Sequence, residues 1–121
     1  MKPQHQKRRV ECMRACVASI LELPYDSVPL IDPDAENVET FLEKWRQFVR
    51  RHGYDLLWIG SEALVHQPKG YSIGVGANKD GEDHAVVCLD GKEVFDPYLG
   101  GAPIEALYTF GYFVALDPKA V

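Results

Sequence analysis

The chain has 121 residues, of which 46% are hydrophobic and 26% are charged, and its formal net charge is −5. These values are typical of one globular domain covering residues 1–121, and the negative charge argues against broad nucleic-acid binding. No apolar run is long enough to span a bilayer and no apolar signal core follows the basic N-terminus, so we expect no membrane partner and a cytoplasmic location. The three cysteines are then expected to be reduced thiols.

Two helices are predicted in the N-terminal half. Between residues 12 and 22, apolar side chains recur every three or four positions and form one stripe: Met13, Cys16, Val17, Ile20 and Leu21. Pro24 ends this pattern. A second helix is predicted from Val38 to Val49, with Gly53 as its C-terminal stop. Residues 23–37, between the two helices, are rich in proline and acidic residues and predict a loop with room for a single helical turn.

Five β-like runs follow the second predicted helix. They cover residues 54–60, 70–76, 84–89, 92–98 and 111–118. Asp90-Gly91, between the third run and the fourth, is a strong signal for a β-hairpin. We therefore predict an α+β fold in which the N-terminal helices pack on one side of an antiparallel meander.

Cys12 is the candidate nucleophile. It falls in the first turn of the first predicted helix, where unpaired backbone N–H groups and the helix dipole favour a thiolate. Cys16 belongs to the apolar stripe and Cys88 lies inside a predicted strand, so we interpret both as core residues. A nucleophilic cysteine also requires a base.

The chain offers four histidines as that base: His5, His52, His66 and His84. Of these, His84 opens a predicted strand directly after a loop rich in glycine and aspartate, which is a rigid position for a catalytic side chain. Asp96 lies on the other arm of the predicted hairpin, and Pro97 favours an extended backbone there. Pairing across the hairpin would bring Asp96 to His84, where a carboxylate fixes the tautomer of the imidazole and stabilises the imidazolium.

Acyl transfer also needs hydrogen-bond donors for the oxyanion. The backbone N–H of Cys12 is one candidate, and the side-chain amide of Gln6 is the other, with Gln4 as its substitute if the register shifts. The set predicts a thiol-dependent hydrolase or acyltransferase that acts on an amide bond through a thioester. Peptide cleavage, deamidation and transamidation share this step, so the residues do not distinguish among them.

Residues 6–21, together with His84 and Phe95-Asp96-Pro97, resemble the papain-like cysteine peptidases, in particular the double-glycine leader peptidases that trim bacteriocin precursors. The positions that carry the resemblance are Gln6, Glu11-Cys12, Ala15-Cys16, His84 and Asp96-Pro97. The chain is also similar to small uncharacterised papain-like proteins of bacteria and phages. The resemblance implies a papain-like fold, a Cys12–His84–Asp96 triad and a peptide or protein substrate. Leader peptidases usually have Gly directly after the nucleophile, where this chain has Met13, so a cleft of different shape is expected.

Several alternatives stay open. The same fold could serve as an inactive binding module, which predicts a buried or unreactive Cys12. Cys12, Cys16, His84 and Asp96 could bind zinc, although the chain lacks paired C-x-x-C knuckles, and a Cys12–Cys16 disulfide is disfavoured by its helical spacing. His84 could be a structural histidine, and Asp96 could simply open a turn. The glycine-containing loop near residues 74–81 lacks the pattern of a nucleotide or calcium site, and we expect neither cofactor nor metal.

Overall fold

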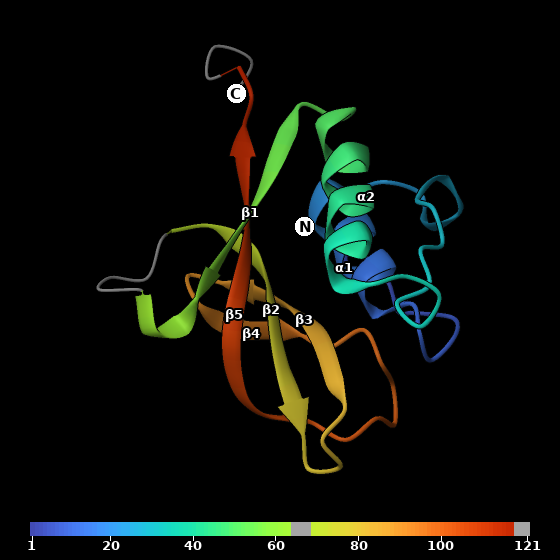
Figure 1. Ribbon diagram of the computed structural model, residues 1–121, viewed down its shortest axis with the longest axis vertical. Helices are drawn as coiled ribbons and strands as arrows, with labels where there is room; N and C mark the ends of the chain where they lie inside the picture. The colour runs from blue at the N-terminus through green and yellow to red at the C-terminus, as the bar shows by residue number, and fades with distance from the viewer. Residues whose placement is uncertain (64–68, 118–121) are drawn as a thin grey trace.

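The computed structural model describes residues 1–63 and 69–117, and it confirms the α+β class (Figure 1). Its elements, in chain order, are α1 (Cys12–Leu21), the short 3-10 helix η1 (Tyr25–Ser27), α2 (Val38–Arg50), β1 (Tyr54–Gly60), η2 (Ser61–Ala63), β2 (Tyr71–Asn78), β3 (Asp83–Leu89), β4 (Lys92–Phe95) and β5 (Ile104–Ala115). His66, one of the four candidate bases, lies outside the described residues.

The five strands form one sheet in the order β1-β5-β2-β3-β4, in which all neighbours are antiparallel. The predicted meander is therefore wrong in one respect, because the last strand is inserted between β1 and β2. Strand β5 has 12 residues and begins at Ile104, well before the predicted start at residue 111. Its first half, residues 104–109, has exposed and partly buried positions but no fully buried one, so it does not read as a continuous apolar run.

The β3–β4 hairpin is formed as predicted. Asp90 and Gly91 both have positive φ, 52° and 83°, and Leu89 pairs with Lys92 across this two-residue turn. Positive φ at both central residues is the geometry of a type I′ turn, which Asp-Gly favours. Strand β4 ends at Phe95, earlier than predicted, because Pro97 has no N–H to contribute to the ladder.

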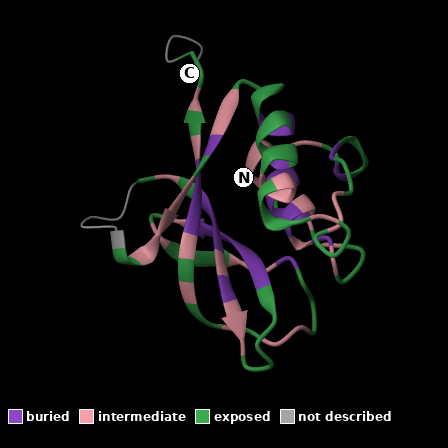
Figure 2. Ribbon diagram, viewed as in Figure 1, coloured by how far each residue is buried: buried purple, intermediate pink, exposed green. Residues whose placement is uncertain are grey.

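Both helices pack on the same face of the sheet, and the buried residues lie between them and the strands (Figures 1 and 2). Six of the ten residues of α1 are buried: Met13, Ala15, Cys16, Val17, Ala18 and Ser19. They share one core with Trp45, Phe48, Ile73, Ala85 and Val87, whereas a smaller cluster covers the opposite face of the sheet with Val86, Cys88, Phe110 and Tyr112. Cys16 and Cys88 are both fully buried, which confirms their interpretation as core residues. Neither helix in the described chain is long and apolar enough to cross a membrane.

Replacing Cys16 by serine should lower the free energy of unfolding by about 1–3 kcal/mol, because it puts a hydroxyl into a fully buried apolar position. Cys12→Ser is the matched control: Cys12 is only partly buried, so the same exchange should cost less. Urea unfolding of both variants measures the difference. A larger loss for Cys12→Ser than for Cys16→Ser would show that the two cysteines have the opposite roles.

Candidate active site

Cys12 is the first residue of α1, and its side chain lies at the positive end of that helix. The N-cap residue, Glu11, makes no capping hydrogen bond with its side chain, and the first turn contains no acidic residue. The backbone N–H groups of this turn are therefore not taken up by a capping side chain. Cys12 is partly exposed, and its thiol is free, as are those of Cys16 and Cys88. This is the environment predicted for a nucleophile.

His84 and Asp96 are hydrogen-bonded, with 2.7 Å between His84 Nε2 and Asp96 Oδ1. The His84 side chain is 9% exposed and that of Asp96 is 24% exposed. The backbone N–H of Tyr98 donates to the same carboxylate oxygen at 2.9 Å. Asp96 thus opens a turn and also orients His84, so the two interpretations of this residue are compatible.

The pKa of His84 is set by two opposing effects. Burial of the ring lowers it, whereas the side chains of Cys12 and Asp96 together raise it more, to about 9. Because Nε2 binds Asp96, Nδ1 is the ring nitrogen left to face Cys12. The three residues predicted as a triad therefore lie together, although they come from the start of α1, from β3 and from the residue after β4.

Gln6 lies beside the site, but its amide is turned toward its own segment. Its backbone N–H donates to the carbonyl of Pro97 at 2.9 Å, which docks the segment before Cys12 against the residue that follows Asp96. The side-chain Nε2 donates to the carbonyls of Arg8 and Arg9, at 2.8 and 3.0 Å. An amide nitrogen has two hydrogens, so both are engaged. The oxyanion role of Gln6 stays a prediction and requires its side chain to rotate.

Gln4, the alternative oxyanion donor, and the histidines His5 and His52 make contacts elsewhere in the fold. Gln4 donates to the carbonyls of Ala18 and Leu23 and so holds the C-terminal end of α1. His5 packs against Phe95, and His52 packs against Phe48. Of the candidate bases that the structure describes, His84 is the one that lines the same cleft as Cys12.

Cys12 and His84 line one cleft, which has a volume of about 320 Å³. The remaining lining is mostly apolar and comes from both helices, the segments that precede them and four strands: Val10, Met13, Pro33, Val38, Phe41, Leu42, Trp58, Val75, Asp83, Ala85, Tyr108 and Thr109. Met13, where the resembled peptidases have glycine, forms part of this wall. Burial and a hydrogen bond to Asp83 raise the pKa of Tyr108 to about 12, so its hydroxyl is protonated at neutral pH.

Trp58, Asp83 and Tyr108 line the cleft but were not predicted from the sequence as site residues. They come from β1, β3 and β5, and only the sheet order brings these strands into reach of one cleft. Tyr108 falls in the half of β5 that the sequence pattern did not predict as a strand. Asp83 directly precedes His84, and this proximity to a candidate base was the one available signal.

Comparisons of the chain with models of known protein families, with curated proteins and with solved structures found no match. In residues 1–63 and 69–117, no three His, Cys, Asp or Glu side chains are grouped so that they could hold a metal ion.

The raised pKa of His84 can be tested by following its ring resonances with pH by NMR. We expect an apparent pKa of about 9, and a lower value in both Cys12→Ala and Asp96→Asn, since each removes a group that favours the imidazolium. His52, which follows α2 and packs against Phe48, is the internal control. An unshifted His84 in the wild-type protein would contradict the geometry.

The same shift predicts how stability depends on pH. Because the pKa of His84 is higher in the folded chain, about 9, than its ordinary value of 6.5, its protonation stabilises the fold fully below pH 6.5. This contribution is lost as the pH rises through about 9. Denaturant unfolding of wild type and His84→Gln between pH 6 and 10 measures it. The difference in unfolding free energy between the two proteins should shrink with rising pH, and a constant difference would refute the linkage.

Proposed function

We propose that this chain is a thiol-dependent hydrolase or acyltransferase of papain-like architecture that acts on an amide bond. Cys12 is the nucleophile, His84 is the acid and base, and Asp96 orients His84. The observation that carries the proposal is the convergence of a cysteine at a helix N-terminus with a hydrogen-bonded His–Asp pair at one apolar cleft. A nucleophile, a base and an orienting carboxylate are the parts that covalent catalysis of acyl transfer requires.

The proposed first half-reaction starts from the Cys12 thiolate and the His84 imidazolium. The pKa of His84 is raised to about 9, so its ring is protonated at neutral pH. Sulfur attacks the carbonyl carbon of the substrate and forms a tetrahedral oxyanion. When the C–N bond breaks, the imidazolium gives its proton to the leaving amine, and a thioester remains on Cys12.

In the second half-reaction, water or an amine attacks the thioester. His84, now neutral, takes the proton of this acceptor, and Cys12 leaves as a thiolate. The acceptor alone decides whether the outcome is hydrolysis or transamidation, and the donor decides whether a peptide bond or a side-chain amide is cleaved. The oxyanion of both half-reactions would be bound by the backbone N–H of Cys12, with Gln6 as the second donor after rotation.

The apolar lining of the cleft favours a substrate whose acyl group, next to the reacting carbonyl, is apolar. Its walls carry the rings of Phe41 and Trp58 and the side chains of Met13 and Val75. Filling it with an apolar side chain would remove apolar surface from water on both partners, at roughly 25 cal/mol per Å². It would also exclude water from the charged pair, which strengthens the interaction of Cys12 with His84.

Alkylation with iodoacetamide at a series of pH values tests the nucleophile, with the modified cysteine located by mass spectrometry. We expect Cys12 to react selectively in the native protein, because it lies partly exposed at the N-terminus of α1 beside His84. The buried Cys16 and Cys88 are internal controls and should react only after unfolding. If Cys12 reacts no faster than these two, the enzyme is refuted, and an inactive binding module becomes the better interpretation.

Acyl transfer itself can be tested with a p-nitrophenyl ester that carries an apolar acyl group. We expect a burst of p-nitrophenol and a thioester on Cys12, and Cys12→Ala should abolish both without unfolding the protein. Gln6→Ala should slow acylation by about 10²-fold, the cost of losing one oxyanion donor, yet leave alkylation by iodoacetamide unchanged because alkylation forms no oxyanion. Equal acylation rates in Gln6→Ala and wild type would remove Gln6 from the site.

A further inference from the structure

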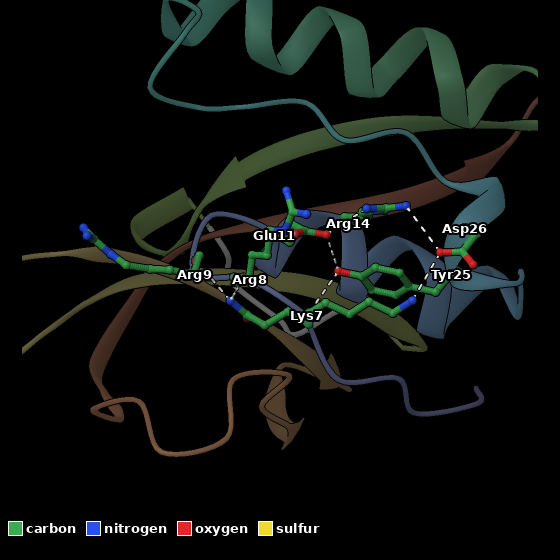
Figure 3. Close-up of polar contacts among 8 residues, drawn as sticks. Lys7, Arg8, Arg9, Glu11, Arg14, Tyr25 and Asp26 are labelled. Atoms are coloured by element: carbon green, nitrogen blue, oxygen red, sulfur yellow. Dashed lines mark hydrogen bonds and ion pairs between the residues drawn. The ribbon is translucent and has the colours of Figure 1, made fainter.

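A cluster of charged residues around one buried carboxylate lies directly beside Cys12 in the chain (Figure 3). At its centre is the carboxylate of Glu11, which is only 2% exposed. One of its oxygens, Oε1, accepts hydrogen bonds from the Tyr25 hydroxyl and from Arg14 Nη1, both at 2.8 Å. The other oxygen, Oε2, lies 3.8 Å from Arg8 Nε. None of these four residues lines the cleft, so the proposed chemistry does not use them directly.

Tyr25 contacts residues that precede Cys12 in the chain and a residue that follows it. It belongs to η1, beyond the C-terminal end of α1, and its side chain reaches back to the start of the helix (Figure 3). Its hydroxyl accepts a hydrogen bond from the backbone N–H of Lys7 at 3.3 Å while it donates to Glu11. The guanidinium of Arg14 lies over its ring, 4.4 Å from the centroid. One ring therefore contacts the segment before Cys12 and the first turn after it.

Stability alone does not account for this cluster. Removing a carboxylate and a guanidinium from water costs free energy, and well-packed apolar residues usually do as well in their place. A carboxylate at the start of α1 would also compete with a Cys12 thiolate for the positive end of the helix. Arg14, one turn further on, offsets the charge of Glu11 at 2.8 Å. The hydrogen bonds fix the position of the Glu11 carboxylate. Because Arg14 compensates its negative charge, the positive end of the α1 dipole still acts on Cys12.

The backbone carries this restraint to Cys12. The carbonyl of Glu11 accepts the N–H of Ala15 at 3.0 Å and so closes the first turn of α1. The N–H of Glu11 donates to the carbonyl of Arg8 at 3.2 Å, which forms the turn before the helix. Both backbone bonds are made by Glu11, and the side chain of the same residue is hydrogen-bonded to Tyr25 and Arg14. A shift of that side chain would therefore tilt the turn that presents the Cys12 thiol.

We infer that Glu11, Tyr25 and Arg14 form a positioning cluster that fixes the first turn of α1 and thereby aims Cys12 at His84. Its catalytic consequence rests on the proposed function, whereas its effect on the Cys12–His84 interaction does not. None of the three is a catalytic residue, since each acts through the position of Cys12. The expected sensitivity is large, because a misplacement of about 1 Å in a reacting group can cost 10²-fold in rate.

The test is Tyr25→Phe, which removes the hydroxyl and leaves the ring under Arg14 in place. Tyr112→Phe is the matched control: both tyrosines are 8% exposed, but the Tyr112 hydroxyl is buried without a hydrogen-bond partner in the described chain. The readouts are the NMR pKa of His84 and the rate of Cys12 alkylation at pH 7. In Tyr25→Phe we expect the pKa of His84 to move from about 9 toward 6.5 and alkylation to slow by roughly tenfold. Tyr112→Phe should leave both unchanged.

Glu11→Asp provides a second variant that keeps the charge but shortens the reach to Tyr25. It should shift both readouts in the same direction as Tyr25→Phe, which separates the geometric effect from an effect of charge on the thiolate. If either variant lowers the melting temperature but leaves the pKa of His84 and the alkylation rate as in wild type, the cluster is only structural and the inference is overturned. A wild-type protein with an unshifted His84 and an unreactive Cys12 would instead refute the proposed function, so the two failures differ.

Discussion

The packing of α1 against β3 is the contact on which the rest of the molecule depends. One face of α1 is buried, and it shares a core with Ala85 and Val87 of β3. The small side chains of Ala15 and Ala18 are fully buried in this interface, where they let the helix backbone approach the sheet closely. Because Cys12 begins α1 and His84 stands at the start of β3, the burial that stabilises the fold also brings the thiol to the imidazole.

Much of this arrangement could be predicted from local patterns. The stripe of α1, the start of α2 and the two-residue Asp90-Gly91 turn are short-range features, and a hairpin of that length fixes its own register. The turn brings the segment of Asp96 back beside β3, but the His84–Asp96 contact also depends on a register shift between Val87 and Cys88, after which Val87 pairs with Phe95. Cys16 and Cys88 were recognised as core because their neighbours alternate with strand or helix periodicity.

The rest depends on contacts between distant segments, which no local pattern contains. A local pattern can predict that a segment forms a strand, but not which strands it pairs with. The pairing of β5 with β1 and β2 is therefore not predicted, and this pairing places Tyr108 in the cleft. Tyr25 and Glu11 lie at opposite ends of α1 in the sequence, and their side chains are hydrogen-bonded. Tyr25 belongs to a proline-rich segment for which the sequence predicts only a loop. The engagement of the Gln6 amide by two carbonyls is likewise a property of how the N-terminal segment folds back on itself.

The pairing of Trp58 with Gly111 has a consequence for how the cleft can be observed. A Cβ atom at position 111 would lie 2.9 Å from the Trp58 ring, so glycine leaves the room that the indole occupies beside β5. The ring is thereby held at the wall of the cleft, partly in contact with solvent. The other of the two tryptophans, Trp45, is fully buried in the core. Binding of a molecule in the cleft would change the polarity around Trp58 and so its fluorescence emission. Trp45 lies away from the solvent, and its emission would serve as a constant reference in the same protein.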